Sequence, residues 1–229
     1  LSATEKAKML FIVQDPYTSY YDAKVVRDFV ALTQKLGFEP IILPFKPNGK
    51  AMHIKGFLAR FSKTAKTQAE FLNRVAKLNV PLVGVDPAIV LSYRDEYKEA
   101  LGDSRGDFHV LTAHEWLTNQ LESNALQSAV KNIAKSDRTF EWHLFPHCTE
   151  STFMPNSPKE WQHIFAQFGQ TLKVEKVGCC GMAGVFGHEV QNQTMSKDIY
   201  DVSWGKKLQG KDPNYCLATG YSCRSQVKR

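Results

Sequence analysis

The chain of 229 residues has no cysteine before position 148 and no long apolar run. Because no stretch of about 18 or more apolar residues occurs, a transmembrane helix is not expected. The first eight residues are polar, so a secretory signal is not expected either. The absence of an initiator Met suggests a fragment of a longer chain. Five cysteines, an odd number, without a signal argue against a disulfide framework and favour a cytoplasmic location with reduced thiols.

Basic residues outnumber acidic residues in this chain, but they are not clustered. The net charge is +6 and the pI is about 9.0, yet Lys and Arg are spread along the chain without interleaved aromatic residues. Nucleic-acid binding is therefore not expected, and the basic residues are interpreted as solvated faces or as a surface for an acidic partner domain. No Ser-His-Asp signature and no phosphate-binding loop is found.

Short apolar runs alternate with segments of helical periodicity, which is typical of α/β proteins with parallel sheets. Strands are predicted at residues 9–13, 40–45, 80–85, 108–112, 139–145, 172–177 and 215–219. Helices are predicted at residues 22–36, 61–78, 89–101, 115–121, 124–134, 158–168 and 189–208.

The two halves of the chain follow one plan. Polar loops at 14–19 and 145–151 each follow a predicted strand, and glycine-containing loops at 48–56 and 179–187 follow the next one. We therefore expect an α/β fold with two similar lobes from an internal duplication, each a small parallel sheet flanked by helices. The predicted lobes are residues 1–121, which lack cysteine, and residues 138–229, with a helical connection at 122–137.

Four cysteines stand just beyond the ends of predicted strands: Cys148, Cys179, Cys180 and Cys223. The carboxyl ends of parallel strands meet at one edge of a sheet, so these thiols are expected to converge. Four sulfur ligands suit zinc or an iron–sulfur cluster. The fifth, Cys216, lies within a predicted strand and is interpreted as a buried thiol.

Glycines and histidines surround the same loops. Gly181, Gly184 and Gly187 would let the backbone approach a cofactor and direct amide N–H groups toward sulfur. His147 and His188 could ligate a metal, donate to a sulfur or transfer a proton, or they could be surface or capping residues.

Polar residues also gather at the corresponding loops of the first half: Asp15, Lys50, His53, Lys55 and Asp86. The two lysines could bind a carboxylate or phosphate, or could face solvent or another domain.

The stretch VGCCGMAGVFGHE at 177–189 resembles the CCG motif of the cysteine-rich domain of heterodisulfide reductases and of the iron–sulfur subunits of glycolate oxidase and anaerobic glycerol-3-phosphate dehydrogenase. The resemblance extends to PHCTES around Cys148 and to ATGYSCRSQV around Cys223. It implies that the whole chain is the two-repeat form of that domain, with Cys148, Cys179, Cys180 and Cys223 as metal ligands.

Phrases such as PNGKAMHIKGFL and VGVDPAIVLSYRDEY resemble the C-terminal region of fused, FAD-linked, iron–sulfur D-2-hydroxyacid dehydrogenases of the D-lactate or D-2-hydroxyglutarate type. This resemblance implies an upstream FAD domain and a ferredoxin-like [4Fe–4S] domain in the same polypeptide. It also implies peripheral contact with a quinone or an acceptor protein, at the inner face of the membrane.

The sequence departs from the family pattern in two places. The first repeat has no cysteine, and the family's final C-x-x-C reads Gly220-Tyr221-Ser222-Cys223, so one thiol is missing. A five-thiolate centre is thus not expected, whereas four thiolates, or three with His147 or His188, are compatible with the residues present.

Three functions follow from these residues. In the first, the chain holds a metal centre for electron transfer in an oxidoreductase acting on a D-2-hydroxy acid. In the second, it is a structural or docking domain with zinc or free thiols. In the third, Cys179 and Cys180 form a vicinal disulfide, which the strain of such a ring disfavours.

Overall fold

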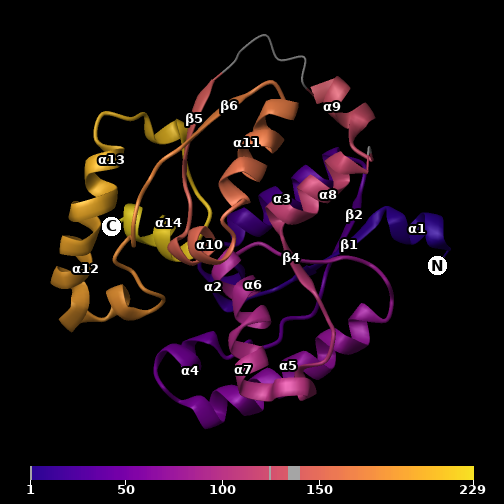
Figure 1. The fold of residues 1–229 in the computed structure, drawn as a ribbon, viewed down its shortest axis with the longest axis horizontal. Coiled ribbons are helices and arrows are strands. Elements are labelled where there is room, and N and C mark those ends of the chain that lie inside the picture. Colours follow the sequence, from indigo (N-terminus) through magenta and orange to yellow (C-terminus); the bar gives the residue numbers. More distant parts are fainter. Residues whose placement is uncertain (1, 124, 134–139) are drawn as a thin grey trace. The chain divides into compact units, whose positions relative to one another are not determined.

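Two parallel sheets, one in each half of the chain, form the framework of this computed structural model (Figure 1). It describes residues 2–123, 125–133 and 140–229 and divides into two units, Leu1–Ala129 (unit 1) and Val130–Arg229 (unit 2). The predicted fold class, two small parallel sheets flanked by helices, is confirmed. The predicted connection at 122–137 includes positions 124 and 134–137, which lie outside the described residues.

Unit 1 is built on a four-stranded sheet in the order β2-β1-β3-β4, with every neighbouring pair parallel. The strands are β1 (Met9–Val13), β2 (Glu39–Ile42), β3 (Leu82–Gly84) and β4 (Val110–Thr112). All five residues of β1 are buried, as its continuous apolar sequence predicts for a strand covered on both faces.

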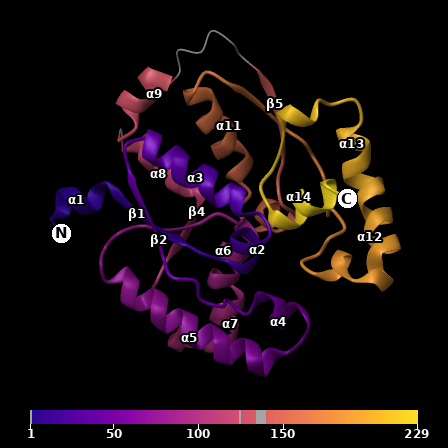
Figure 2. The ribbon, with the colours of Figure 1, turned by 180° about the vertical axis from the view of Figure 1, so that it is seen from behind.

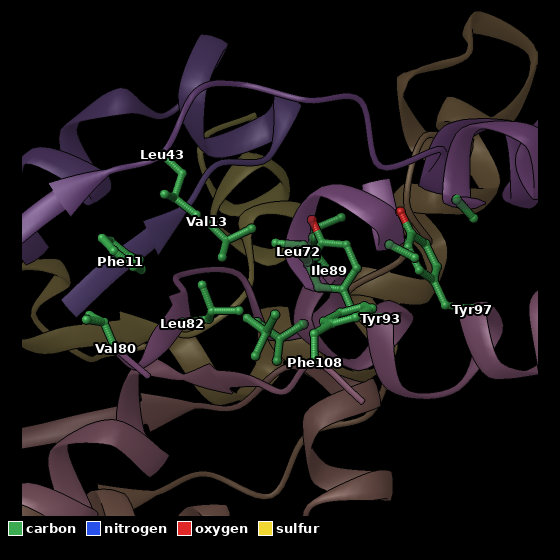
Figure 3. Packing of buried hydrophobic residues seen from close by; sticks show 14 of the residues in the cluster. Phe11, Val13, Leu43, Leu72, Val80, Leu82, Ile89, Tyr93, Tyr97 and Phe108 are labelled. Atoms are coloured by element: carbon green, nitrogen blue, oxygen red, sulfur yellow. The ribbon is translucent and has the colours of Figure 1, made fainter. Parts of the chain in front are cut away.

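Helices cover this sheet and complete the core of unit 1. In α5 the residues Phe61, Ala65, Ala69 and Leu72 recur at helical spacing and are all buried. They pack with β-strand residues and with Tyr93 and Tyr97 (Figure 3). The helices are α1 (Ala3–Ala7), α2 (Pro16–Tyr20), α3 (Ala23–Lys35), α4 (Lys50–Ile54), α5 (Leu58–Ala76), α6 (Pro87–Arg94), α7 (Glu96–Leu101), a 3-10 turn (Gly102–Arg105), α8 (Ala113–Glu122) and, across the boundary of the units, α9 (Gln127–Ile133).

Unit 2 has a three-stranded parallel sheet in the order β6-β5-β7. Helix α14 lies beside α12 (Figure 2), and Gln226 of α14 donates to the Ser196 carbonyl of α12 at 3.1 Å. The strands are β5 (Glu141–Phe145), β6 (Thr171–Val174) and β7 (Cys216–Ala218), and the helices are α10 (Cys148–Phe153), α11 (Ser157–Gln167), α12 (Gln193–Tyr200), α13 (Lys206–Leu208) and α14 (Tyr221–Val227). Short 3-10 turns cover Phe186–His188, Val190–Asn192 and Pro213–Tyr215.

The two sheets share the order of the first three strands of each unit. In each, the first strand of the unit is central, the second strand lies on one side of it and the third on the other. Because all these strands are parallel, their carboxyl ends lie at one edge of each sheet. The internal duplication itself stays a prediction.

Two predicted long helices are interrupted. The helix predicted at 89–101 is two helices, α6 and α7, separated at Asp95. The helix predicted at 189–208 is a succession of a 3-10 turn, α12, a π-helical turn (Asp201–Gly205) and α13. Apolar spacing alone does not distinguish these helix types, because each keeps apolar residues on roughly one side over so few turns.

Short helices replace three predicted loops. Asp15 accepts hydrogen bonds from Tyr17 N–H at 2.8 Å and Thr18 N–H at 2.9 Å and so begins α2. His147 begins α10 in the same way, and α4 follows Gly49. Helices of five or six residues are too short for a periodic pattern, so only the capping residue could have signalled them.

Candidate functional site

The structure brings the four predicted cysteines together at the carboxyl edge of the sheet of unit 2. Cys148 begins α10 directly after β5, the pair Cys179 and Cys180 lies in the loop after β6, and Cys223 lies in α14 after β7. The sulfurs are within hydrogen-bonding range in a chain of contacts: Cys148 with Cys179, Cys179 with Cys180, and Cys180 with Cys223. We call these four residues the thiol cluster.

The thiol cluster extends from the core of unit 2 toward its surface. Cys180 and Cys223 are 2% and 1% exposed and pack with Phe145, Met182 and Trp204. Cys148 and Cys179 are partly exposed. A ligand on these sulfurs would therefore be shielded from water on its inner side and reachable from its outer side.

The loop after β6 turns its amide groups toward Cys179. Gly181 has a φ of +87°, and a Cβ at this position would lie 2.0 Å from the Ser196 carbonyl oxygen, so only glycine fits. In this conformation the Gly181 N–H donates to Cys179 Sγ at 3.3 Å, and the Ala183 N–H also reaches it. Successive amides around one atom form an anion-binding concavity, here centred on sulfur.

These contacts separate the acidities of the thiols. Hydrogen bonds from Cys148 and Cys180, aided by the Gly181 and Ala183 amides, lower the pKa of Cys179 against the effect of burial. The hydrogen bond to Cys179, together with burial, raises the pKa of Cys148, and hydrogen bonds with Cys179 and Cys223 raise that of Cys180. Cys179 is therefore the sulfur of the cluster that carries negative charge most readily.

The other predicted glycines and His188 lie farther along the same loop. A Cβ on Gly187 would come within 2.5 Å of Ser196 Oγ, so this glycine allows close packing on α12. Gly184 has a φ of +68°. His188 is exposed and stacks on Tyr221 at a ring distance of 6.4 Å, and burial and the charge of Arg229 lower its pKa. Their predicted roles in binding a cofactor stay predictions.

Both ring nitrogens of His147 take part in hydrogen bonds within unit 2. Its Nδ1 accepts from the Thr149 N–H at 3.1 Å, which leaves the proton on Nε2, and Nε2 lies 3.1 Å from Ser222 Oγ. Gly220 makes room for the ring, since a Cβ there would lie 2.3 Å from His147 Cδ2. In this arrangement His147 caps the helix that begins at Cys148, which is one of the alternatives considered from the sequence.

Glu150 is a site residue whose role the sequence did not reveal. Its side chain is fully buried and accepts hydrogen bonds from the Ser157 and Thr219 hydroxyls and, at 3.1 Å, from the Trp161 indole N–H. The position of Glu150 in the first turn of a helix is ordinary for a surface acid. Nothing in the sequence around Glu150 distinguishes this residue from an acid on the surface of a helix.

Cys216 is separate from the chain of sulfur contacts. Its thiol donates to the Asp212 carbonyl at 3.4 Å, and burial raises its pKa. It packs against the same apolar core as Cys180 but is only partly buried, so the interpretation of Cys216 as a buried thiol was only partly right.

Within residues 2–123, 125–133 and 140–229, no group of three or more His, Cys, Asp or Glu side chains is arranged to hold a metal ion. The four thiols nonetheless come from three loops at one sheet edge, and sulfur is a ligand that zinc and iron–sulfur clusters prefer.

The corresponding edge of unit 1 carries oxygen in place of sulfur. Asp15 and Asp86 are 2% and 3% exposed and cap α2 and α6, while Lys50 forms an ion pair with Glu96. Burial and the nearby charge of Asp86 raise the pKa of Asp15 to about 6. Lys50 thus has an intramolecular partner, and the proposed binding of an anion there stays untested.

The described part of the chain has no helix that could cross a membrane. No family model matches the chain.

Known proteins resemble the chain from end to end. All 229 residues align with D-2-hydroxyglutarate dehydrogenases, at 81% identity in Haemophilus influenzae, 58% in Escherichia coli and 40% in Pseudomonas putida. This chain is similar to a segment of a dehydrogenase. It spans 22% of the length of each of these relatives, which are therefore much longer polypeptides.

Proposed function

We propose that this chain is the C-terminal cysteine-rich module of a FAD- and iron–sulfur-dependent dehydrogenase that oxidises a D-2-hydroxy acid, and that the thiol cluster holds a metal centre. The names of the relatives make D-2-hydroxyglutarate the first substrate to test. The observation that carries the proposal is the convergence of Cys148, Cys179, Cys180 and Cys223 from three loops at one sheet edge.

The donor set suits a thiolate-bound centre. Four sulfurs are the ligands that zinc and iron–sulfur clusters prefer, and N–H groups aimed at sulfur tune the reduction potential of such clusters. The Gly181 amide already donates to Cys179 Sγ. When bound, an iron–sulfur centre would supply a one-electron carrier. The apolar residues Phe145, Met182 and Trp204 would exclude water from its inner side.

A second candidate function has its own support. The thiols contact one another, and no arrangement ready for a metal is found among the described residues. This favours a docking or structural domain whose cysteines stay reduced or take zinc. A vicinal disulfide between Cys179 and Cys180 is the weakest candidate, because the ring that joins adjacent cysteines is strained.

The rest of the enzyme is part of the proposal. The FAD domain and a ferredoxin-like [4Fe–4S] domain would lie in the remaining length of the polypeptide, and the electron acceptor would be a quinone or a protein. We further propose that units 1 and 2 are two repeats of one cysteine-rich domain, of which only the second keeps its thiols. A cytoplasmic location, with peripheral contact at the inner face of the membrane, completes this proposal.

The test is elemental analysis of the chain purified without oxygen, counting iron, zinc and acid-labile sulfide per chain. Iron and sulfide that are lost in Cys180→Ser but retained in Cys216→Ser support the electron-transfer centre. The Cys216 variant is the matched control, because it removes a thiol of the same unit outside the cluster. Zinc alone, lost in the same variant, supports the structural function. Absence of all three elements with five free thiols overturns the metal centre for this chain.

A further inference from the structure

The thiol cluster depends on the relative placement of three segments. Cys148 is carried by α10, Cys223 by α14, and the pair Cys179–Cys180 by the loop between β6 and α12. None of these segments is long, and α10 has only six residues. A helix of this length is not stable by itself in water, so contacts with its neighbours must hold it in place.

Glu150 makes these contacts for α10. It lies two residues after Cys148 on the same helix and is fully buried. Its Oε1 accepts from Ser157 and Trp161 of α11, and its Oε2 accepts from Thr219 in the turn between β7 and α14. One carboxylate thus joins the helix of Cys148 to the segment that leads directly into the helix of Cys223.

The turn bearing Thr219 is tied at several further points. The Thr219 hydroxyl accepts from the His147 N–H at 2.9 Å, and the Arg224 guanidinium donates to the Ala218 and Thr219 carbonyls at 3.0 and 2.9 Å. Arg224 is the residue after Cys223. The hydrogen-bonded path therefore runs from Glu150 through Thr219 to the backbone beside Cys223.

We propose that Glu150 is a positioning residue that sets the placement of Cys148 relative to Cys223 and so allows the thiol cluster to hold a metal. This inference rests on the proposed function of the cluster. The carboxylate is suited to the task because its two oxygens bind donors from two segments at once. An apolar replacement would leave the buried Ser157 hydroxyl, and the partly buried Thr219 hydroxyl and Trp161 N–H, without their acceptor.

Three variants of the full 229-residue chain test the proposal. Glu150→Ala removes the acceptor of Ser157, Trp161 and Thr219. Glu150→Gln keeps an acceptor for Ser157 and Trp161 and can donate to Thr219 Oγ, so it preserves the placement. Glu175→Ala is the matched control, because it removes another buried carboxylate of unit 2, one that binds His143 at 2.8 Å and Lys211 at 3.5 Å.

Two readouts are combined. Cobalt(II) titration reports metal affinity through the thiolate-to-cobalt absorption band. Cross-linking by dibromobimane without metal, mapped by mass spectrometry, reports which thiol pairs are adjacent. Loss of a residue that does not touch the metal but orients one of the side chains that bind it weakens metal binding about 10- to 100-fold. We expect that loss in Glu150→Ala, together with fewer cross-links from Cys148, while Cys180–Cys223 cross-links persist.

The outcomes separate the two proposals. Wild-type affinity and cross-links in Glu150→Ala, equal losses in Glu175→Ala, or equal losses in Glu150→Gln would each overturn the positioning role. If wild-type protein binds no cobalt, the metal centre fails, yet the cross-link pattern still decides the role of Glu150. If Glu150→Ala does not fold, Thr219→Val replaces it, since it breaks the same path and keeps the contacts with α11. Thr219→Val with wild-type cross-links would then overturn the inference.

Discussion

The two units place different chemistry on the same arrangement of strands. At the strand ends of unit 1, Asp15 and Asp86 accept the first amide hydrogens of α2 and α6. At the strand ends of unit 2, α14 begins at Gly220 without a side-chain cap, and loop amides point at the sulfur of Cys179. In unit 1 carboxylates cap both of these helices, whereas in unit 2 His147 caps α10 and the sulfur atoms of the thiol cluster occupy the rest of that edge.

The comparison shows why a shared fold does not imply a shared site. A capping carboxylate binds the backbone donors that a ligand would otherwise use. In unit 2 the start of α14 has no side-chain cap, and the Gly181 amide points at a thiol, which is a weak acceptor. Carboxylates that cap helices at two loops of unit 1, and thiols at three loops of unit 2, therefore give the two sheet edges different capacities to bind a ligand.

The largest expected effect concerns the independence of the two units. Trp204→Ala in unit 2 and Trp116→Ala in unit 1 each remove a fully buried indole and should each cost about 3–5 kcal/mol. Trp204 packs on Phe145 at 5.1 Å, and Trp116 on Phe38 at 4.9 Å. Hydrogen exchange read by mass spectrometry should show the loss of protection confined to the unit that carries the substitution. Loss across both units in either variant would mean that they unfold as one.

The second prediction uses the opposite responses of two buried acids to pH. The pKa of Asp15 is raised from 3.8 to about 6, so the folded protein binds this proton more tightly than the unfolded chain. The contribution of Asp15 to the stability of unit 1 should be largest below about pH 4 and should fall by about 3 kcal/mol as pH rises through 6. Asp15→Asn should abolish this loss and stabilise unit 1 at pH 8.

The contribution of Glu175 to the stability of unit 2 changes with pH in the direction opposite to that of Asp15. Burial favours a higher pKa, but the hydrogen bond from His143 and the charge of Lys211 outweigh it and lower the pKa of Glu175. Its contribution to stability should be present at neutral pH and fall as pH drops below about 4.5. Denaturant titrations at pH 4 and pH 8, with unit-specific exchange as the probe, measure both responses. Unchanged pH dependence of unit 1 in Asp15→Asn would show that another group titrates.

The third prediction contrasts two glycines with similar backbone angles. Gly181 (φ +87°) and Gly37 (φ +89°) both adopt left-handed conformations, but only the former has an atom, Ser196 O, where a Cβ would lie. Gly37→Ala should cost about 1 kcal/mol from backbone strain. Gly181→Ala should cost about 2–3 kcal/mol through the added clash, and should also raise the pKa of Cys179 by displacing the Gly181 amide. Thermal unfolding and the pH dependence of thiol alkylation test both effects.

The smallest expected effect concerns His147 as a cap. His147→Ala should cost about 1 kcal/mol, because the Thr149 N–H loses its acceptor, and His147→Asn should restore most of it. Neither substitution should change the metal content of the chain, since both ring nitrogens already bind within unit 2. Metal lost in both variants with unchanged stability would instead identify His147 as a ligand.

Sequence reasoning worked best where a single physical pattern acts over many residues. The apolar run of β1 and the spaced apolar residues of α5 predicted a buried strand and an amphipathic helix, because burial repeats with the geometry of each element. It failed at α10 and α2, which are one turn long, and at Asp95 and the turn at Asp201–Gly205, where the helix is interrupted. These features depend on single capping bonds or on packing from elsewhere in the chain.

For the candidate site, the sequence by itself determined which residues could take part. Five thiols in the second half pointed to sulfur chemistry there, and the polar loops of the first half offered Asp15, Asp86 and the lysines as candidates for binding an anion or for facing solvent. Only the tertiary structure decided that Cys216 stays apart, that His147 caps a helix, that Cys179 accepts the loop amides and that Glu150 joins two cysteine-bearing segments. The physical reason is that these roles arise from contacts between segments up to about 70 positions apart, as between Glu150 and Thr219, and local sequence carries no record of such contacts.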